Sequence, residues 1–213
     1  MTNNDQNIDP AAMFKFSYGL FVLTAKDGAK DNGCIINTAM QITSTPLRIS
    51  MTVSKSNFTH DMILKTGLFN ISVLDTSVPF EIFKQFGFQS GRDTDKFANT
   101  SNDKKKRSQN GILYIPENTN CVISGKVINS YDYDTHTIFT ADVTESAILS
   151  KEPSVTYQYY FDNIKPKPEP VKESKKGFIC KICGHIYEGD TLPADYICPI
   201  CKHGAADFEP LPA

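Results

Sequence analysis

The sequence has no long apolar run, no signal-peptide core and little net charge. No stretch approaches the ~20 consecutive apolar residues that a membrane-spanning helix needs. The opening residues, MTNNDQNIDPAAM, lack the apolar segment of a signal peptide. A net charge of −2 gives no reason to expect a nucleic acid or an acidic membrane as partner. We therefore expect a protein that binds neither nucleic acid nor membrane.

Several motifs of nucleotide binding and catalysis are also missing. No GxGxxG follows a predicted strand, so the chain lacks the Rossmann mode of dinucleotide binding. A P-loop and a nucleophile elbow are absent as well. Any nucleotide cofactor must then bind in another way, and no side chain is assigned as a catalytic acid, base or nucleophile.

Four of the six cysteines form two CxxC pairs near the C-terminus, Cys180 with Cys183 and Cys198 with Cys201. Each pair predicts a tight turn that points two thiolates at one spot, and four thiolates at tetrahedral corners suit zinc or a single iron. A disulfide pair or free thiols are the alternative. The remaining Cys34 and Cys121 are expected to be reduced thiols, which indicates a cytoplasmic protein.

The residues before these pairs predict many strands and few helices. Strands are expected over 20–25, 32–43, 47–54, 68–74, 112–115, 121–129 and 137–149, and short helices over 9–18, 57–66 and 79–86. Strands without regular helix alternation favour a mainly β fold, an antiparallel closed or nearly closed barrel. Prolines alternate with charged residues over 164–176, which predicts an extended linker between a domain of residues 1–163 and one of residues 177–213.

A phosphate-binding segment is predicted at the start of the second helix. Residues 54–60, SKSNFTH, supply hydroxyl groups, amide groups and a lysine where a helix begins. A helix N-terminus attracts anions through its free N–H groups and its dipole. The alternative is an ordinary polar helix entry, with Asn57 as its cap. His60 follows closely and could touch the same phosphate.

The C-terminal strings CKICGHIYEGD, DYICPIC and DFEPL resemble rubredoxin, the one-iron electron carrier. The short loop between the two pairs is more similar to the rubredoxin-type domain of rubrerythrins. Tyr196 stands where longer rubredoxins usually have tryptophan, and Lys202 where a glycine is usual. The resemblance implies iron rather than zinc at Cys180, Cys183, Cys198 and Cys201, with zinc as the alternative.

The segments DNGCIINTAMQITSTPLRISMTVSKSNFTHDMI, GLFNISVL and FKQFGFQSGRDTDKF resemble the flavin reductase-like proteins with an FMN-binding split barrel. The resemblance implies FMN at a homodimer interface. It implies that the isoalloxazine ring is lined by Asn32, Cys34, Asn37 and Thr38, and that the ribityl chain and phosphate are held by Ser54, Lys55, Asn57 and Thr59. Arg92 could meet the flavin or a nicotinamide phosphate, or form a surface ion pair with Asp93 or Asp95. Cys34 could instead be a small buried residue.

The order of the two parts resembles the high-molecular-weight rubredoxins, fusions of an NAD(P)H:flavin oxidoreductase with a rubredoxin. This resemblance implies that FMN takes a hydride from NAD(P)H and passes single electrons to the iron. It also implies a redox protein as acceptor, of the flavodiiron type that reduces oxygen or nitric oxide. Two alternatives remain open: a free-flavin reductase with a structural zinc ribbon, and a non-enzymatic flavin-binding module.

Overall fold

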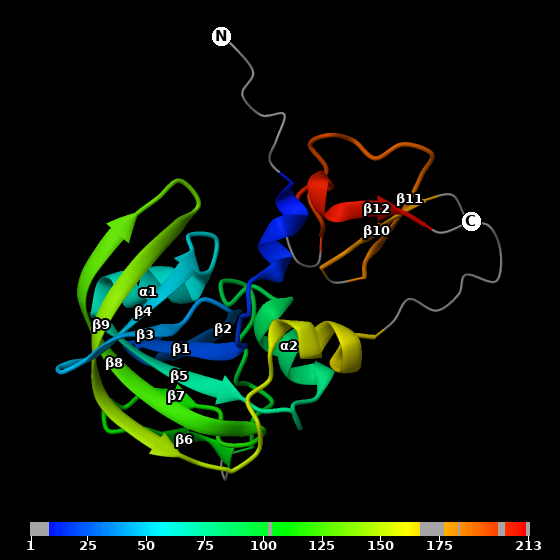
Figure 1. Cartoon of the computed structure of the whole chain (residues 1–213). Coiled ribbons are helices and arrows are strands. Elements are labelled where there is room, and N and C mark those ends of the chain that lie inside the picture. The colour runs from blue at the N-terminus through cyan, green and yellow to red at the C-terminus, as the bar shows by residue number, and fades with distance from the viewer. Residues whose placement is uncertain (1–8, 102–103, 167–176, 183, 200–202, 212–213) are drawn as a thin grey trace.

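The structure is a computed structural model that describes residues 9–101, 104–166, 177–182, 184–199 and 203–211. Strands dominate, and a curved sheet lies apart from a small three-stranded unit at the C-terminal end (Figure 1). Among the described residues, no helix is long and apolar enough to cross a membrane. The expected mainly β fold is therefore confirmed.

Seven strands form one antiparallel sheet in the order β2-β1-β5-β8-β9-β4-β3. They are β1 (Phe21–Asp27), β2 (Lys30–Ile36), β3 (Met40–Ser44), β4 (Leu47–Ser54), β5 (Leu68–Leu74), β8 (Thr119–Asp132) and β9 (His136–Ile148). The long β8–β9 pair has two irregularities in register, and such bulges bend a sheet. The sheet curls around a core that includes the fully buried Leu23, Met51, Phe69 and Phe139.

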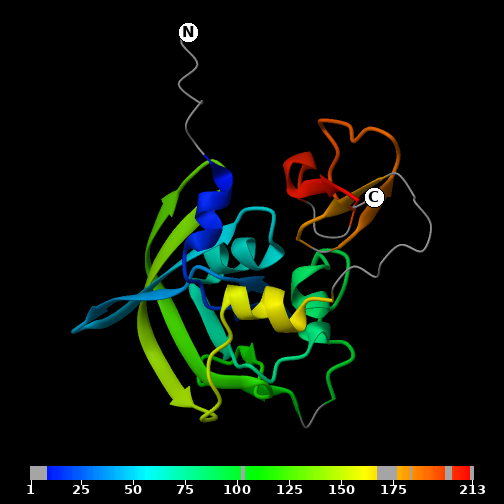
Figure 2. The ribbon, with the colours of Figure 1, turned by 45° about the vertical axis from the view of Figure 1, so that its right-hand side comes forward.

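Short helices close the barrel and build a second core beside it. α1 (Phe58–Thr66) ends at Gly67 and buries Met62 and Ile63 in the barrel interior. α2 (Phe80–Gly87) buries Phe83 and Phe86 against α3 (Tyr157–Tyr159) and the π-helical η3 (Tyr160–Ile164). The remaining elements of this part are η1 (Pro10–Lys15), β6 (Lys106–Arg107) and β7 (Leu113–Tyr114). Figure 2 shows α2 and η3 side by side, on the side of the barrel that faces the C-terminal unit.

Three details differ from the sequence prediction. The single strand expected over 32–43 is two strands, β2 and β3, because residues 37–39 are not in a strand. We call residues 37–39 the break between β2 and β3. Thr38 holds this break against β4, where its hydroxyl donates to the carbonyl oxygen of Thr52 at 2.8 Å. The strand expected over 121–129 is longer, since β8 pairs with β9 as far as the turn after Asp132. Cys121, expected in the core, is only partly buried.

The C-terminal unit has strand order β11-β10-β12. Its elements are β10 (Gly177–Cys180), β11 (Ile186–Glu188), the 3₁₀ turn η4 (Ala205–Asp207) and β12 (Phe208–Pro210). Its small core consists of Cys180, Cys198 and Phe208, with Tyr187 and Tyr196 packed against them. Most of the predicted linker, residues 167–176, lies outside the described residues.

Candidate flavin site and metal centre

The first turn of α1 is open to an anion. Asn57 occupies the N-cap position with extended backbone, φ −75° and ψ 128°, but its side chain makes no capping hydrogen bond. The first N–H groups of a helix have no partner within the helix, and a capping side chain is what usually accepts from them. The side-chain cap expected as the ordinary alternative is therefore not formed.

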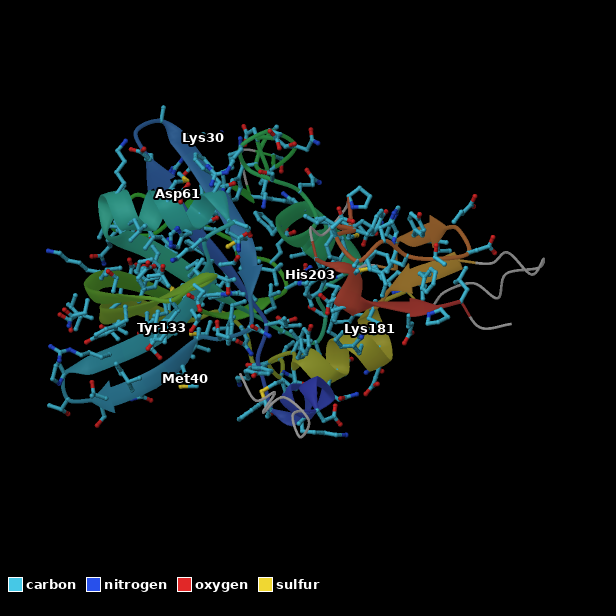
Figure 3. All side chains as sticks on the ribbon, turned by 90° about the horizontal axis from the view of Figure 1, so that it is seen from above. Lys30, Met40, Asp61, Tyr133, Lys181 and His203 are labelled. Carbon is cyan, nitrogen blue, oxygen red and sulfur yellow. The ribbon has the colours of Figure 1, made fainter. Side chains whose placement is uncertain are left out.

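Three positively charged side chains gather around this turn, and we call Lys30, Lys55 and Arg92 the cationic cluster. The Phe58 ring lies between two of them, 4.7 Å from the Lys30 ammonium and 5.2 Å from the Arg92 guanidinium. Lys30 is labelled beside α1 in Figure 3, where Asp61 marks the helix itself. Because a helix N-terminus and three cations act on the same side of the barrel, their fields add for an approaching phosphate.

Each of two cluster members is held by a carboxylate. Lys55 donates to Asp132 at 2.8 Å, and Arg92 donates to Asp61 at 2.7 Å. The hydrogen bond from Lys55 is the main reason that the pKa of Asp132 is lowered. Burial alone would raise the pKa of Asp61, but the bonds from His60 and Arg92 together lower it. The ion pair of Arg92 is thus with Asp61, on α1, and not with Asp93 or Asp95, the partners considered in the surface alternative.

The side chains expected beside the flavin ring separate into two groups. Asn32 and Cys34 are buried, where the Asn32 amide donates to the Thr59 hydroxyl at 2.9 Å. Burial raises the pKa of Cys34, which keeps it a neutral thiol in the barrel core. Asn37 and Thr38 instead lie in the break between β2 and β3, where they are only partly buried. The buried alternative for Cys34 therefore fits the structure, while the break is the part of this set that is accessible to a ligand.

A buried polar atom lies next to the loop that carries Arg92. The Asn32 side-chain oxygen is buried and has no hydrogen-bond partner among the described residues. Gly91 packs directly on it, so closely that a Cβ atom at Gly91 would lie 2.1 Å from this oxygen. The residue at this position must be glycine for the loop carrying Arg92 to approach β2.

Lys96 is a buried charge that the sequence reasoning missed. Its ammonium group donates to the carbonyl oxygens of Gly33 at 2.8 Å and Phe86 at 3.0 Å, and only 5% of the residue is exposed. Burial lowers its pKa. Lys96 thereby joins β2, α2 and the loop that carries Arg92. The only sequence signal was its place in the DTDKF string, since lysine usually lies at the surface.

Replacing Lys96 by methionine should destabilise the barrel. The substitution fills a similar volume but leaves two buried carbonyl groups without donors, which costs on the order of 2–4 kcal/mol in the free energy of unfolding. Urea unfolding followed by far-UV circular dichroism measures this loss. The exposed Lys126 is the matched control, and Lys126→Met should change stability little. Equal stability of the two variants would contradict the structural role of Lys96.

The two described cysteines of the C-terminal unit lie in turns of the same geometry. The N–H of Cys180 donates to the carbonyl oxygen of His185, and that of Cys198 donates to His203, both at 2.8 Å. Both cysteines are almost fully buried. Gly184, with φ +78°, closes the first turn through a bond to the carbonyl oxygen of Cys180. Both cysteines belong to the same small core, and two buried thiols in one core suit a tetrathiolate centre.

The other two expected ligands, Cys183 and Cys201, lie outside the described residues, as does Lys202. Within the described ranges, no three His, Cys, Asp or Glu side chains converge on a possible ion. A ring nitrogen of His185 lies 3.1 Å from the Tyr196 hydroxyl.

The C-terminal unit contacts the barrel through the aromatic second core. The ammonium of Lys165, just after η3, donates to the carbonyl oxygen of Lys181 in the first CxxC pair. Burial raises the pKa of Tyr157, and the negative charge of Asp207 adds to this. Figure 3 shows Lys181 beside the helix of α3 and η3. The turn that carries Cys180 is therefore next to a cluster of Tyr and Phe rings on the barrel.

Comparison with known proteins identifies both parts. Residues 13–167 match the family model described as flavin reductase like domain, and residues 178–209 match the rubrerythrin, rubredoxin-like domain. The chain belongs to the flavin reductase-like family. It is 35% identical to the high molecular weight rubredoxin of Moorella thermoacetica over 95% of this chain and 99% of the relative.

Two further relatives cover the flavin reductase-like part. The ferric-chelate reductase (NAD(P)H) of Archaeoglobus fulgidus is 31% identical over 72% of this chain and 89% of its own length. The structure of the NADH:FAD oxidoreductase of Streptomyces globisporus superposes with a TM-score of 0.62 at 18% identity, over 70% of this chain and 90% of that protein. At this identity the superposition shows the fold alone.

These findings confirm the expected family, the expected rubredoxin-like tail and the class of flavin-dependent oxidoreductase. The assignment of single residues to FMN or to iron stays a prediction. So do the boundaries of the two domains at residues 163 and 177.

Proposed function

We propose that the chain takes electrons from NAD(P)H onto FMN and passes them to its own rubredoxin-type iron, and from there to a separate redox protein. The proposal depends on the combination of two features in one chain. A flavin reductase-like barrel has an uncapped helix N-terminus with cationic side chains around it, and a rubredoxin-like unit has buried cysteines from two CxxC motifs. NAD(P)H as donor is further supported by the name of the Archaeoglobus relative.

The residues at α1 fit the phosphate of FMN. The uncapped N–H groups of α1, the hydroxyl of Ser54 and the ammonium of Lys55 supply donors and positive charge in one loop. Arg92 adds a guanidinium, which binds phosphate oxygens in pairs. Thr38 and Asn37, in the break before β3, are the side chains best placed to line the ring. Thr59 and Asn32 lie beneath this surface and brace it, since they bond to each other.

FMN, when bound, accepts two electrons as a hydride and releases them singly, whereas a tetrathiolate iron carries one at a time. The chain's own part is to hold both groups and to keep water from them. Cys180 and Cys198 are buried, and burial of thiolate ligands tunes the potential of an iron centre. The contact of Lys165 with Lys181 sets the iron unit next to the aromatic core of the barrel.

A homodimer is part of the proposal. Large apolar side chains are exposed near the break that would meet the flavin ring, among them Met40, 63% exposed, and at the end of β9, where Ile148 is 78% exposed. An apolar cavity of about 300 Å³ opens beside Met40, lined in part by Phe21, Leu47 and Val143. Exposed apolar patches of this kind mark protein interfaces. A second copy would cover them and close the flavin site.

The acceptor and the compartment complete the proposal. A rubredoxin-type centre passes single electrons, which suits a flavodiiron-type acceptor that reduces oxygen or nitric oxide. Cys34 and Cys121 are unpaired, which suits a reducing compartment such as the cytoplasm.

Anaerobic stopped-flow absorbance tests the electron path in the iron-loaded full chain mixed with NADH and, separately, with NADPH. We expect the flavin band to bleach first and the iron–thiolate band to follow at a rate that does not change with protein concentration. That independence shows transfer within one molecule or dimer. A metal band that stays oxidised, or zinc in protein made with ample iron, would reduce the function to flavin reduction with a structural tail.

A further inference from the structure

A continuous line of polar contacts runs through the barrel wall from Arg92 to Lys55. Arg92 donates to Asp61 at 2.7 Å, and the other oxygen of Asp61 is 3.0 Å from Nδ1 of His60. Nε2 of His60 is 2.8 Å from the Thr137 hydroxyl, which donates to Asp132 at 2.9 Å. Asp132 accepts from Lys55 at 2.8 Å. Two members of the cationic cluster are therefore joined through one buried histidine.

The protons in this line can be counted. An ionised carboxylate only accepts hydrogen bonds, so Asp61 needs a proton on Nδ1 of His60. A hydroxyl has one proton to donate, and Thr137 gives it to Asp132. Thr137 must then accept from Nε2 of His60. Every contact is satisfied only when both ring nitrogens carry a proton, which makes His60 an imidazolium cation.

The surroundings of His60 favour that charge. The groups that face it are Asp61 on α1, Thr137 on β9 and, through Thr137, Asp132. The Phe139 ring packs on its flank, with ring centres 5.7 Å apart. Arg92 and Lys55 lie one carboxylate further away on either side. Only 4% of His60 is exposed, so water does not replace these partners.

We propose that His60, protonated on both ring nitrogens, is a positioning residue that joins the Lys55 and Arg92 ion pairs into one unit with excess positive charge toward the phosphate of FMN. The unit holds three cations against two carboxylates, and a neutral His60 would leave none in excess. With a neutral ring, Thr137 would turn its proton to Nε2 and leave Asp132. The inference rests on the proposed FMN site, and it adds a residue that has no contact with the cofactor itself.

Flavin fluorescence tests this proposal. The dissociation constants for FMN and for riboflavin are determined on the full chain between pH 6 and 8.5. The ratio of the two constants isolates the contribution of the phosphate. At pH 6 we expect His60→Gln to lower the preference for FMN about tenfold, the effect of about 1.4 kcal/mol. Thr137→Val, which cuts the line beyond His60, should lower the preference by less.

The controls separate this inference from the proposed function. The phosphate of free FMN titrates near pH 6, which is common to all measurements, so only the difference between proteins counts. His136→Gln removes an exposed histidine that contacts Thr135 and should behave as wild type. A wild-type protein with no preference for FMN over riboflavin would refute both proposals. A preference that His60→Gln leaves unchanged at every pH would refute this one alone.

A second measurement uses the wild-type protein, so it does not depend on whether a variant folds. The chain has four histidines, and ¹⁵N NMR of histidine-labelled wild-type protein distinguishes an imidazolium from either neutral tautomer. At pH 6.5 with FMN bound, one buried ring should show two protonated nitrogens, in contact with the methyl group of Thr137. A neutral ring at that position would overturn the proposal.

Discussion

Replacing Cys198 by serine is expected to abolish iron binding and all electron transfer beyond the flavin. Cys198 is fully buried in the centre of the C-terminal unit, where its N–H also closes the second turn. A serine hydroxyl is a poor ligand for a centre built from soft thiolates. Since metal binding supplies on the order of 10 kcal/mol in small structural sites of this kind, the unit should also unfold.

The flavin half of the reaction should survive this change. The barrel has its own core, separate from that of Cys180, Cys198 and Phe208, so bleaching of the flavin by NAD(P)H should continue. Metal analysis and the iron–thiolate absorbance band measure the loss. Cys121→Ser, at a partly buried cysteine of the barrel, is the matched control and should keep one iron per chain. Retention of iron by the Cys198 variant would remove it from the ligand set.

The sequence predicts well the features that depend on local residue patterns. Alternating apolar residues predict the strands, and the pattern over 57–66 predicts the helix that the structure shows as α1. The CxxC pairs predict the turns around Cys180 and Cys198, because two residues between cysteines leave little conformational choice. Local patterns also predict the polar loop that carries Lys55, which the structure places between the end of β4 at Ser54 and the start of α1 at Phe58.

The features that it misses depend on contacts between distant segments. Arg92 pairs with Asp61, which is 31 positions away, and not with its neighbours Asp93 and Asp95. Lys96 is buried because the carbonyl groups of Gly33 and Phe86 converge on it, and no local pattern encodes this. The break at residues 37–39 depends on the bond from Thr38 to β4. Such contacts arise only once the barrel closes.

Substitutions in the cationic cluster should have the largest effect on FMN binding. In the double variant Lys55→Ala/Arg92→Ala, both charge-assisted donors to the phosphate are lost. A net hydrogen bond to a charged group contributes about 1.5–3 kcal/mol, so each loss should weaken binding by about tenfold or more. Together they should raise the dissociation constant for FMN by about 100-fold, while that for riboflavin changes little, because riboflavin has no phosphate.

The change in FMN affinity should be measured at a pH at which Asp61 and Asp132 do not titrate. The lowered pKa values of Asp61 and Asp132 mean that each ion pair stabilises the fold above the unfolded pKa of about 4. That stabilisation is lost only as the pH falls through the lower folded value. At neutral pH both carboxylates are therefore ionised in every variant, and a change in FMN affinity does not come from their titration. After the substitutions Asp61 and Asp132 keep their contacts with His60 and Thr137 but lose Arg92 and Lys55, so their negative charge adds repulsion to the lost attraction.

The matched control lies on the same helix. Lys65, in the last turn of α1, pairs with Asp27 at 2.6 Å, and Lys65→Ala removes a cation and an ion pair far from the first turn. It should leave the preference for FMN over riboflavin unchanged. Rising salt should weaken FMN binding in the wild type and much less in the double variant, because screening acts on charges that the double variant no longer has. Equal salt dependence would show that the phosphate binds elsewhere, and the FMN site would have to be sought away from α1.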